Sequence, residues 1–275
     1  MEEAYDRYEF ALSLYRKYEQ FVGEKENMLL ASIFVGMSKV MKLYGNLPGI
    51  ALEEENMAQF YNPKQQESYL LQAIYLYEGL VENEDERFKI VLAEAYLEYG
   101  KILGQRGEYL EACTYYDKSI FMYKKMETDS ERIKLAIAKA YCDYGIYLST
   151  YHLENNSYFF KAENYFEEAI KLHKELEICA EDYSEEFQAE YAFMLGSYAK
   201  FLGKMKNSKK AIMYYQRSID LLCPLQQDLY ILLLAQQYIA FSDYLWNNGI
   251  MIEYSRKLYT KGMDLYEEYG IDITE

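Results

Sequence analysis

One pattern of small and aromatic residues recurs along the chain and restricts its possible folds more than any other feature. Each copy is followed by the next after about 43 to 54 residues. Recurrence at such intervals is typical of arrays in which each repeat buries its apolar face against its neighbours. The four copies begin at Ala93, Ala138, Ala192 and Ala235.

Each copy has two halves. The first half places an aromatic residue directly before a small one, with a leucine three residues later. The second half has a small residue, an aromatic one four positions on, and another small one after three more. Spacings of three and four put each set on one helix face, so each copy is predicted to form a close-packed helical hairpin. The equivalent residues are Tyr99, Gly100, Leu103, Ala112, Tyr116 and Ser119; Tyr144, Gly145, Leu148, Ala162, Phe166 and Ala169; Tyr198, Ala199, Leu202, Ala211, Tyr215 and Ser218; and Phe241, Ser242, Leu245, Ser255, Tyr259 and Gly262.

Helix start and stop signals agree with this phasing. Residues 62–65 (Asn-Pro-Lys-Gln) combine an N-cap, a proline at the first helical position and a capping-box glutamine. The ranges 128–131 and 182–185 repeat the capping-box spacing, which predicts N-caps at Thr128 and Asp182. Pro224 stands where the second helix of the third copy is expected to stop.

The whole chain is expected to be one continuous all-α solenoid with no sheet. We expect residues 1–84 to hold irregular N-terminal helices and a degenerate repeat with an insertion. Four regular hairpins are expected over 85–269, followed by a tail at 270–275.

Within the N-terminal part, residues 62–80 have the pattern of a second helix, and its partner is expected in 28–44. Between them, the Gly- and Pro-containing residues 45–49 and an acidic stretch predict an enlarged loop with a short helix. Residues 2–21 are expected to form one more amphipathic helix. This helix is either an N-terminal cap or half of a repeat, and the second option would make the chain part of a longer protein.

The run Ala-Tyr-x-x-Tyr-Gly-x-x-Leu over 95–103, followed by Gly-x-Tyr-x-Glu-Ala-x-x-x-Tyr over 107–116, resembles a tetratricopeptide repeat. The longer period is similar to that of kinesin light chains and of sensor arms in bacterial signal-transduction ATPases and caspase-like proteases. This resemblance implies a right-handed superhelix of about five stacked antiparallel helix pairs. It also implies that the concave face binds peptide or protein.

The charge balance excludes several classes of partner. The chain has 45 acidic and 29 basic residues and a net charge of −16. Because nucleic acids and anionic membranes attract clustered Lys and Arg, neither is an expected partner. The acidic N-terminus is unlike a signal peptide, and the longest apolar run, 230–235, is far shorter than the roughly 20 residues of a membrane span. With four dispersed cysteines expected to stay reduced, the chain is predicted to be cytoplasmic.

Catalytic signatures are scarce, so we expect a protein that is not an enzyme and has no catalytic residues. The only histidines, His152 and His173, are far apart in sequence, and no short ligand spacing predicts a metal site. Gly100, Gly104 and Gly107 lack the lysine and the preceding strand of a phosphate-binding loop. No cofactor and no metal are therefore expected.

The first helix of each hairpin is the one that lines the groove in the family resembled. Three lysines among its inward positions predict a local positive stripe and hence a partner with an acidic segment. The carboxylate clamp of chaperone-binding repeats is not reproduced at these positions. The predicted groove residues are Leu97, Lys101, Lys139, Ile146, Phe193, Lys200, Ile239, Asp243, Trp246 and Asn247.

Two functions fit these observations. The first is a non-catalytic scaffold for protein–protein interactions, whose groove binds a peptide or helix of a partner. The alternative is a regulatory sensor array that binds a peptide or small ligand and controls an attached or associated effector enzyme. The sequence leaves the partner, the pathway and the oligomeric state open.

Overall fold

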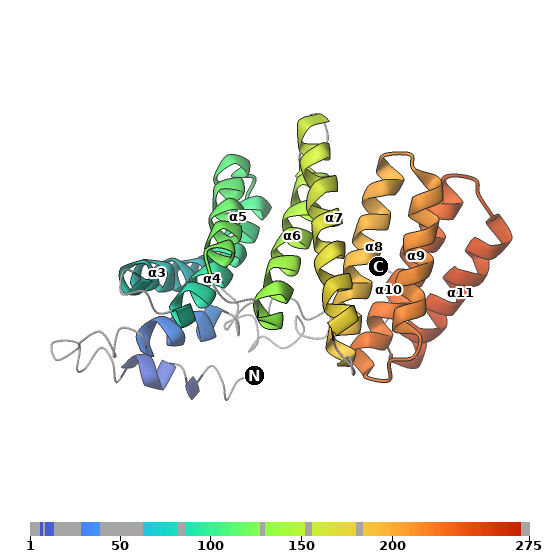
Figure 1. Ribbon diagram of the computed structural model, residues 1–275. Coiled ribbons are helices and arrows are strands. Elements are labelled where there is room, and N and C mark those ends of the chain that lie inside the picture. The colour runs from blue at the N-terminus through green and yellow to red at the C-terminus, as the bar shows by residue number, and fades with distance from the viewer. Residues whose placement is uncertain are drawn as a thin grey trace. The chain divides into compact units, whose positions relative to one another are not determined.

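The computed structural model describes residues 6–7, 9–13, 29–38, 63–81, 86–126, 130–151, 156–179 and 184–270. Throughout these residues the regular structure is helical, which confirms the all-α class (Figure 1). Contacts divide the chain into two compact units, Met1–Asp129 and Ser130–Glu275, termed the N-terminal and C-terminal units. The helices are α3 (Pro63–Val81), α4 (Glu86–Gln105), α5 (Tyr109–Lys124), α6 (Glu131–Tyr151), α7 (Asn156–Cys179), α8 (Glu185–Lys204), α9 (Ser208–Leu222), α10 (Asp228–Asn247) and α11 (Ile252–Glu268).

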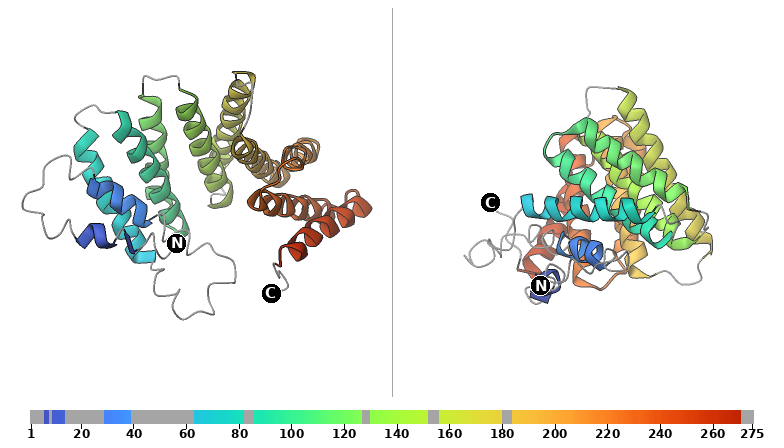
Figure 2. Two further views of the ribbon diagram at one scale, coloured as in Figure 1. Left: turned by 90° about the horizontal axis from the view of Figure 1, so that it is seen from below. Right: turned by 90° about the vertical axis from the view of Figure 1, so that its left-hand side faces the viewer.

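Successive helices are packed as pairs. The pair α4–α5 lies in the N-terminal unit, and the pairs α6–α7, α8–α9 and α10–α11 lie in the C-terminal unit. Figure 2 shows from two further directions that the partners of a pair run side by side. This arrangement confirms the stacked helical hairpins, each of which buries its apolar face against its neighbours. The unit boundary falls inside the array expected over 85–269, and the right-handed twist of the complete array stays a prediction.

The small residues of the repeat bring paired helices into close contact. A Cβ atom on Gly145 would lie 3.1 Å from the ring of Phe166, and one on Gly100 would lie 3.2 Å from that of Tyr116. At a second small position, Ser119 and Ser218 each donate a hydrogen bond to a carbonyl oxygen of the paired helix, at 2.7 and 2.6 Å. The predicted spacing therefore places these residues where two helices meet.

One aromatic residue of the pattern is not buried. Phe166 and Tyr215 pack against the first helix of the following pair, where Phe166 stacks on Tyr198 and Tyr215 on Phe241. The equivalent Tyr259 is 47% exposed, and Leu258 is buried instead. The prediction for Tyr259 was wrong because α11 belongs to the last described pair, so no following helix in the described residues covers it.

The helix start signals need one correction. Pro63 does begin α3, and α9 ends at Leu222, just before Pro224. The N-caps of α6 and α8 are Ser130 and Ser184, whose side chains accept hydrogen bonds from the backbone N–H groups of Ile133 and Phe187. Each cap lies two residues after the predicted one, because the short serine side chain directly before the helix reaches the free N–H groups of the first turn.

In the N-terminal unit, α3 packs against α4 and against the helical residues 29–38. Phe34 stacks on Tyr69 at 5.7 Å, and the hydroxyls of Ser32 and Tyr77 lie 3.1 Å apart. These contacts confirm that 62–80 and 28–44 contribute partner helices, as far as the described residues extend. The enlarged loop predicted around 45–55 lies outside the described residues. None of the described helices combines the length and apolar composition needed to cross a bilayer.

Candidate functional site

In the C-terminal unit, the first helices of the pairs lie closer together than the second helices do. Helix α6 contacts α8, and α8 contacts α10. Among the described helices, α7 and α9 have no comparable contact with the next second helix. A stack with this spacing curves with its first helices inside. We term the surface of α6, α8 and α10 the inner face and that of α7, α9 and α11 the outer face.

The α6 and α8 residues of the predicted groove differ in exposure. Phe193 is 42% exposed, Lys139 and Lys200 are exposed, and Ile146 is half-buried. The Lys139 ammonium lies 3.1 Å from a carboxylate oxygen of Glu190 and so joins α6 to α8 by an ion pair. Lys139 is therefore partly neutralised, whereas Phe193 presents apolar surface to solvent.

The α10 residues divide between the inner face and the α10–α11 seam. Asp243 and Asn247 are exposed, whereas a side-chain carbon of Ile239 would lie 2.7 Å from a Cβ on Gly262 of α11. Trp246 is 51% exposed, and the guanidinium of Arg256 lies 5.6 Å from its ring centroid. Trp246 thus has a cationic neighbour on α11 and still offers half its surface to solvent.

The two groove residues predicted on α4 belong to the N-terminal unit. Leu97 is only 4% exposed and contributes to packing. The ammonium of Lys101 lies 3.0 Å from a carboxylate oxygen of Glu98, three residues earlier on the same helix.

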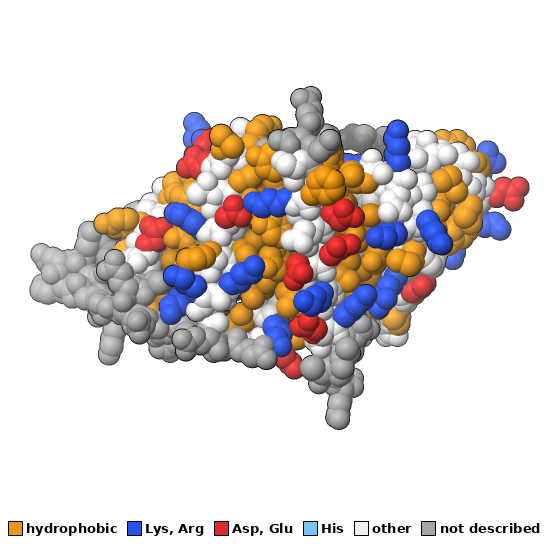
Figure 3. Space-filling model, turned by 45° about the horizontal axis from the view of Figure 1, so that its top comes forward, with side chains coloured by type: hydrophobic (Ala, Val, Ile, Leu, Met, Phe, Trp, Pro, Cys, Tyr) orange, Lys and Arg blue, Asp and Glu red, His pale blue; other side chains and the backbone are white. Residues whose placement is uncertain are grey.

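A basic stretch covers the end of α8 and most of α9, and sequence reasoning considered only one of its basic residues, Lys200. Residues 200–219 contain six basic side chains and no acidic one, although the whole chain has a net charge of −16. Lys204 donates a hydrogen bond to the Ser149 carbonyl at 2.9 Å, and burial and the charge of Lys200 lower its pKa. Counting charge in short windows of the sequence would have revealed this stretch. Figure 3 shows one face of the molecule, on which basic and acidic side chains stand among apolar ones. The six are Lys200, Lys204, Lys206, Lys209, Lys210 and Arg217.

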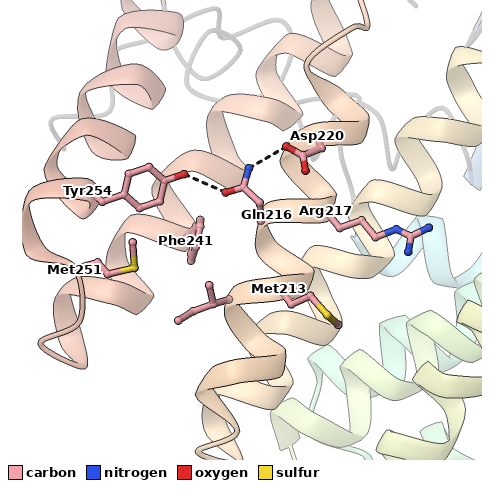
Figure 4. A pocket seen from close by; sticks show the side chains of 8 residues that line it. Met213, Gln216, Arg217, Asp220, Phe241, Met251 and Tyr254 are labelled. Atoms are coloured by element: carbon pink, nitrogen blue, oxygen red, sulfur yellow. Dashed lines mark hydrogen bonds between the residues drawn. The ribbon is translucent and has the colours of Figure 1, made fainter.

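A cavity of about 660 Å³ lies on the outer face between α9 and α11 (Figure 4). Phe241 of α10 forms its floor and is 1% exposed. Met213 of α9 and Met251 at the start of α11 both border the cavity and are 52% and 55% exposed, and the Met213 side chain extends away from Met251 (Figure 4). The cavity is lined by Ile212, Met213, Gln216, Arg217, Asp220, Phe241, Met251 and Tyr254.

Hydrogen bonds connect the two walls of this cavity. The Tyr254 hydroxyl of α11 donates to the Gln216 side-chain oxygen of α9 at 3.0 Å. The Gln216 amide in turn donates to Asp220 at 2.9 Å (Figure 4). A second hollow of about 450 Å³ adjoins Met251 and Tyr254 on α11. The ridge formed by these two residues therefore separates two depressions of the outer face.

The position of Met251 results from a longer turn. The small residues that flank the turn are 12 residues apart in the first and third hairpins (Gly100 to Ala112, Ala199 to Ala211) but 13 apart in the fourth. The extra residue places Met251 at the N-cap of α11 with a φ of 49°, in the left-handed region that non-glycine residues rarely adopt. The spacing is visible in the sequence, but the cavity that it borders is not.

The histidine that the structure describes is a packing residue. His173 is 2% exposed and stacks on Tyr191 at 4.9 Å, in the seam between α7 and α8. Its Nδ1 lies 3.0 Å from the Ala169 carbonyl oxygen and donates to it, and burial lowers the pKa of the ring. His152 lies outside the described residues. Within the part that is described, no three His, Cys, Asp or Glu side chains gather as metal ligands would.

No protein-family model matches the chain, and no curated protein matches its sequence significantly. Many solved structures resemble it, including those of Nro1 and RapI. The S. pombe nuclear import adaptor Nro1 is 17% identical with a TM-score of 0.54, over 91% of this chain and 82% of that chain. The apo form of RapI is 15% identical with a TM-score of 0.56, over 96% and 90% of the two chains. These likenesses agree with a fold of stacked helical pairs.

Proposed function

We propose that the chain is a non-catalytic protein-interaction module, and that the inner face of its C-terminal unit binds a segment of a partner protein. One observation carries this proposal. Helices α6, α8 and α10 lie next to one another, and Phe193 of α8 and Trp246 of α10 are both large, exposed aromatic residues. Large aromatic residues supply much of the energy of protein interfaces because they bury a large apolar area on binding.

The charge of the inner face supports a partner with an acidic segment. Lys200 is exposed and has Lys204 one helical turn further along α8. Lys139 and Lys101 each lie beside a glutamate, so their attraction for a partner is reduced. We therefore expect Lys200 to contribute more to partner binding than the other two predicted lysines.

The neighbours in fold are consistent with this role. Nro1, whose fold is similar, is described as a nuclear import adaptor. By analogy, the present chain would connect a partner protein to a further component. We also propose that the chain is located in the cytoplasm. The sensor alternative and the resemblance to kinesin light chain and bacterial sensor repeats stay predictions, and an ATPase or protease domain in the same gene would favour them.

The test begins with a pull-down from native lysate and mass spectrometry, followed by binding measurements on the purified partner. Trp246 is the only tryptophan, so its emission would report on a partner bound near the end of α10. Binding of the partner should change this emission. A variant that carries both Phe193→Asp and Lys200→Glu should bind the partner more weakly.

The matched control is Phe160→Asp, because Phe160 is 71% exposed on α7 and therefore on the outer side. It should leave both affinity and emission unchanged. A partner that binds the Phe193→Asp, Lys200→Glu variant as tightly as the natural chain would contradict the inner-face assignment, provided that the variant's thermal unfolding is unaltered.

A further inference from the structure

The cavity between α9 and α11 opens on the outer face, so inner-face binding does not use it. It combines exposed apolar walls with a buried aromatic floor. Met213 and Met251 are both more than half exposed, although methionine is apolar. Clustered exposed apolar side chains mark binding surfaces, and the unbranched methionine side chain adapts to differently shaped partners.

The floor of the cavity is held in place before any partner arrives. Phe241 stacks on Tyr215 at 5.0 Å and meets Tyr254 edge-on at 6.1 Å. The bond from Tyr254 to Gln216 ties α11 to α9 across the cavity. A rigid floor reduces the conformational entropy lost on binding, whereas the two methionines can still adjust.

The charged residues around the cavity differ between its two ends. Lys209 and Lys210 precede Met213 by four and three residues, so they stand one turn before it on α9. Arg217 borders the cavity one turn after Met213, but its guanidinium lies 5.7 Å from the ring centroid of Tyr191 on α8. Asp220 lies at the far end of the same wall. On α11, Glu253 and Lys257 have opposite signs and add no net charge. The positive end of the cavity is therefore the end at which α9 begins.

We propose that this cavity is a second protein-binding site, which takes a peptide segment with a bulky apolar residue next to acidic residues. The apolar side chain would lie beside Met251 above Phe241, with Met213 at the α9 edge of the cavity, and the acidic residues would lie over Lys209 and Lys210. The site does not depend on inner-face binding. Charge complementarity supports this occupant, because the basic stretch 200–219 is exceptional in a chain of net charge −16.

The test is a selection from a random peptide library displayed on phage, with the full chain as target and a Met213→Glu variant as the counter-target. The selected peptides should share an acidic run beside Leu, Phe or Met. Synthetic copies should bind the natural chain about tenfold more tightly than the Met213→Glu chain, which corresponds to losing one anchor contact. Binding should also weaken with added salt and in a Lys209→Glu, Lys210→Glu variant.

Two controls separate this site from the inner face and from misfolding. Met213→Leu keeps an apolar wall and should retain the affinity, whereas Phe193→Asp on the inner face should not change it. If Met213→Glu fails to fold, methyl NMR of the natural chain labelled at methionine replaces it. The Met213 and Met251 methyl signals should then shift on adding the peptide.

Three results of the peptide selection would overturn the proposal. They are a library that yields no binding peptide, selected peptides that lack acidic residues, and peptides that bind the folded Met213→Glu chain equally well. A cavity that takes up only small apolar dyes would likewise contradict a peptide site. None of these results would affect the inner-face test, which uses Phe193 and Trp246.

Discussion

The ring of Phe166 lies 3.1 Å from the point that a Cβ atom on Gly145 would occupy. Gly145 lies on α6 and Phe166 on α7, and the Phe166 side chain is fully buried. The phenyl ring thus occupies the space that the missing side chain leaves free. This contact joins the two helices of one hairpin, and its equivalents recur along the array.

Gly145→Leu should therefore destabilise the chain, because a large side chain would displace Phe166 or separate α6 from α7. Overpacking of this kind costs about 1–3 kcal/mol of the free energy of unfolding. Thermal and urea unfolding followed by circular dichroism would measure it. Gly79→Ala is the control, since a Cβ on Gly79 meets nothing within 4 Å, and it should stabilise α3 by roughly 0.5–1 kcal/mol. Equal effects of the two substitutions would contradict the close contact at Gly145.

His173 should make stability depend on pH in the mildly acidic range. Burial lowers the pKa of its ring below the ordinary value of 6.5, so the unfolded chain takes up a proton before the folded chain does. This contribution to stability is complete above pH 6.5 and is lost as the pH falls toward the folded pKa, by at most about 1.4 kcal/mol per pH unit. The pH dependence of urea unfolding should become shallower below pH 6.5 in His173→Gln. An unchanged slope would show that the pKa of His173 is the same in the folded and unfolded chains, and would contradict the prediction.

The buried tyrosines should destabilise the array at alkaline pH. Burial, together with the charges of Glu67 and neighbouring groups, raises the pKa of Tyr99 to about 12. Burial also raises the pKa values of Tyr198 and Tyr215. Because the unfolded chain loses these protons from about pH 10, stability should fall as the pH rises above that value.

Tyrosinate absorbance and circular dichroism should then change together in one cooperative transition. Tyr215→Phe removes one of the contributing hydroxyls and should shift the transition to higher pH. If the tyrosine absorbance titrates fully before any helix is lost, the hydroxyls are accessible in the folded chain and the prediction fails.

Met251→Gly should weaken peptide binding without lowering the stability of the chain. Glycine adopts the left-handed region without strain, so this change should leave stability unaltered or raise it by up to about 1 kcal/mol. It also removes one apolar wall of the outer cavity, so the selected peptides should bind more weakly. Thermal unfolding and fluorescence anisotropy would measure the two effects. Lys206→Gly, at the other described non-glycine residue with positive φ, is the comparison that leaves the cavity wall in place.

The sequence by itself determined that each repeat folds as a helical hairpin and which small residues lie in its seam. Spacings of three and four specify a helix face, and a glycine or alanine beside a ring specifies close approach, so Gly145 and Phe166 could be paired without a structure. These are local properties of one or two helices.

Only the tertiary structure decided which residues of the pattern are exposed and where the surface is hollow. Tyr259 has the same local pattern as Tyr215, but no helix follows it in the described residues, so its ring is exposed. The N-caps shifted to Ser130 and Ser184 because backbone geometry selects among several capable side chains. The outer cavity arises because the second helices α9 and α11 stand apart in the curved stack while a longer turn brings Met251 to its edge. Burial and cavities depend on the neighbour that each surface meets, and the spacing of residues along one repeat does not contain that information.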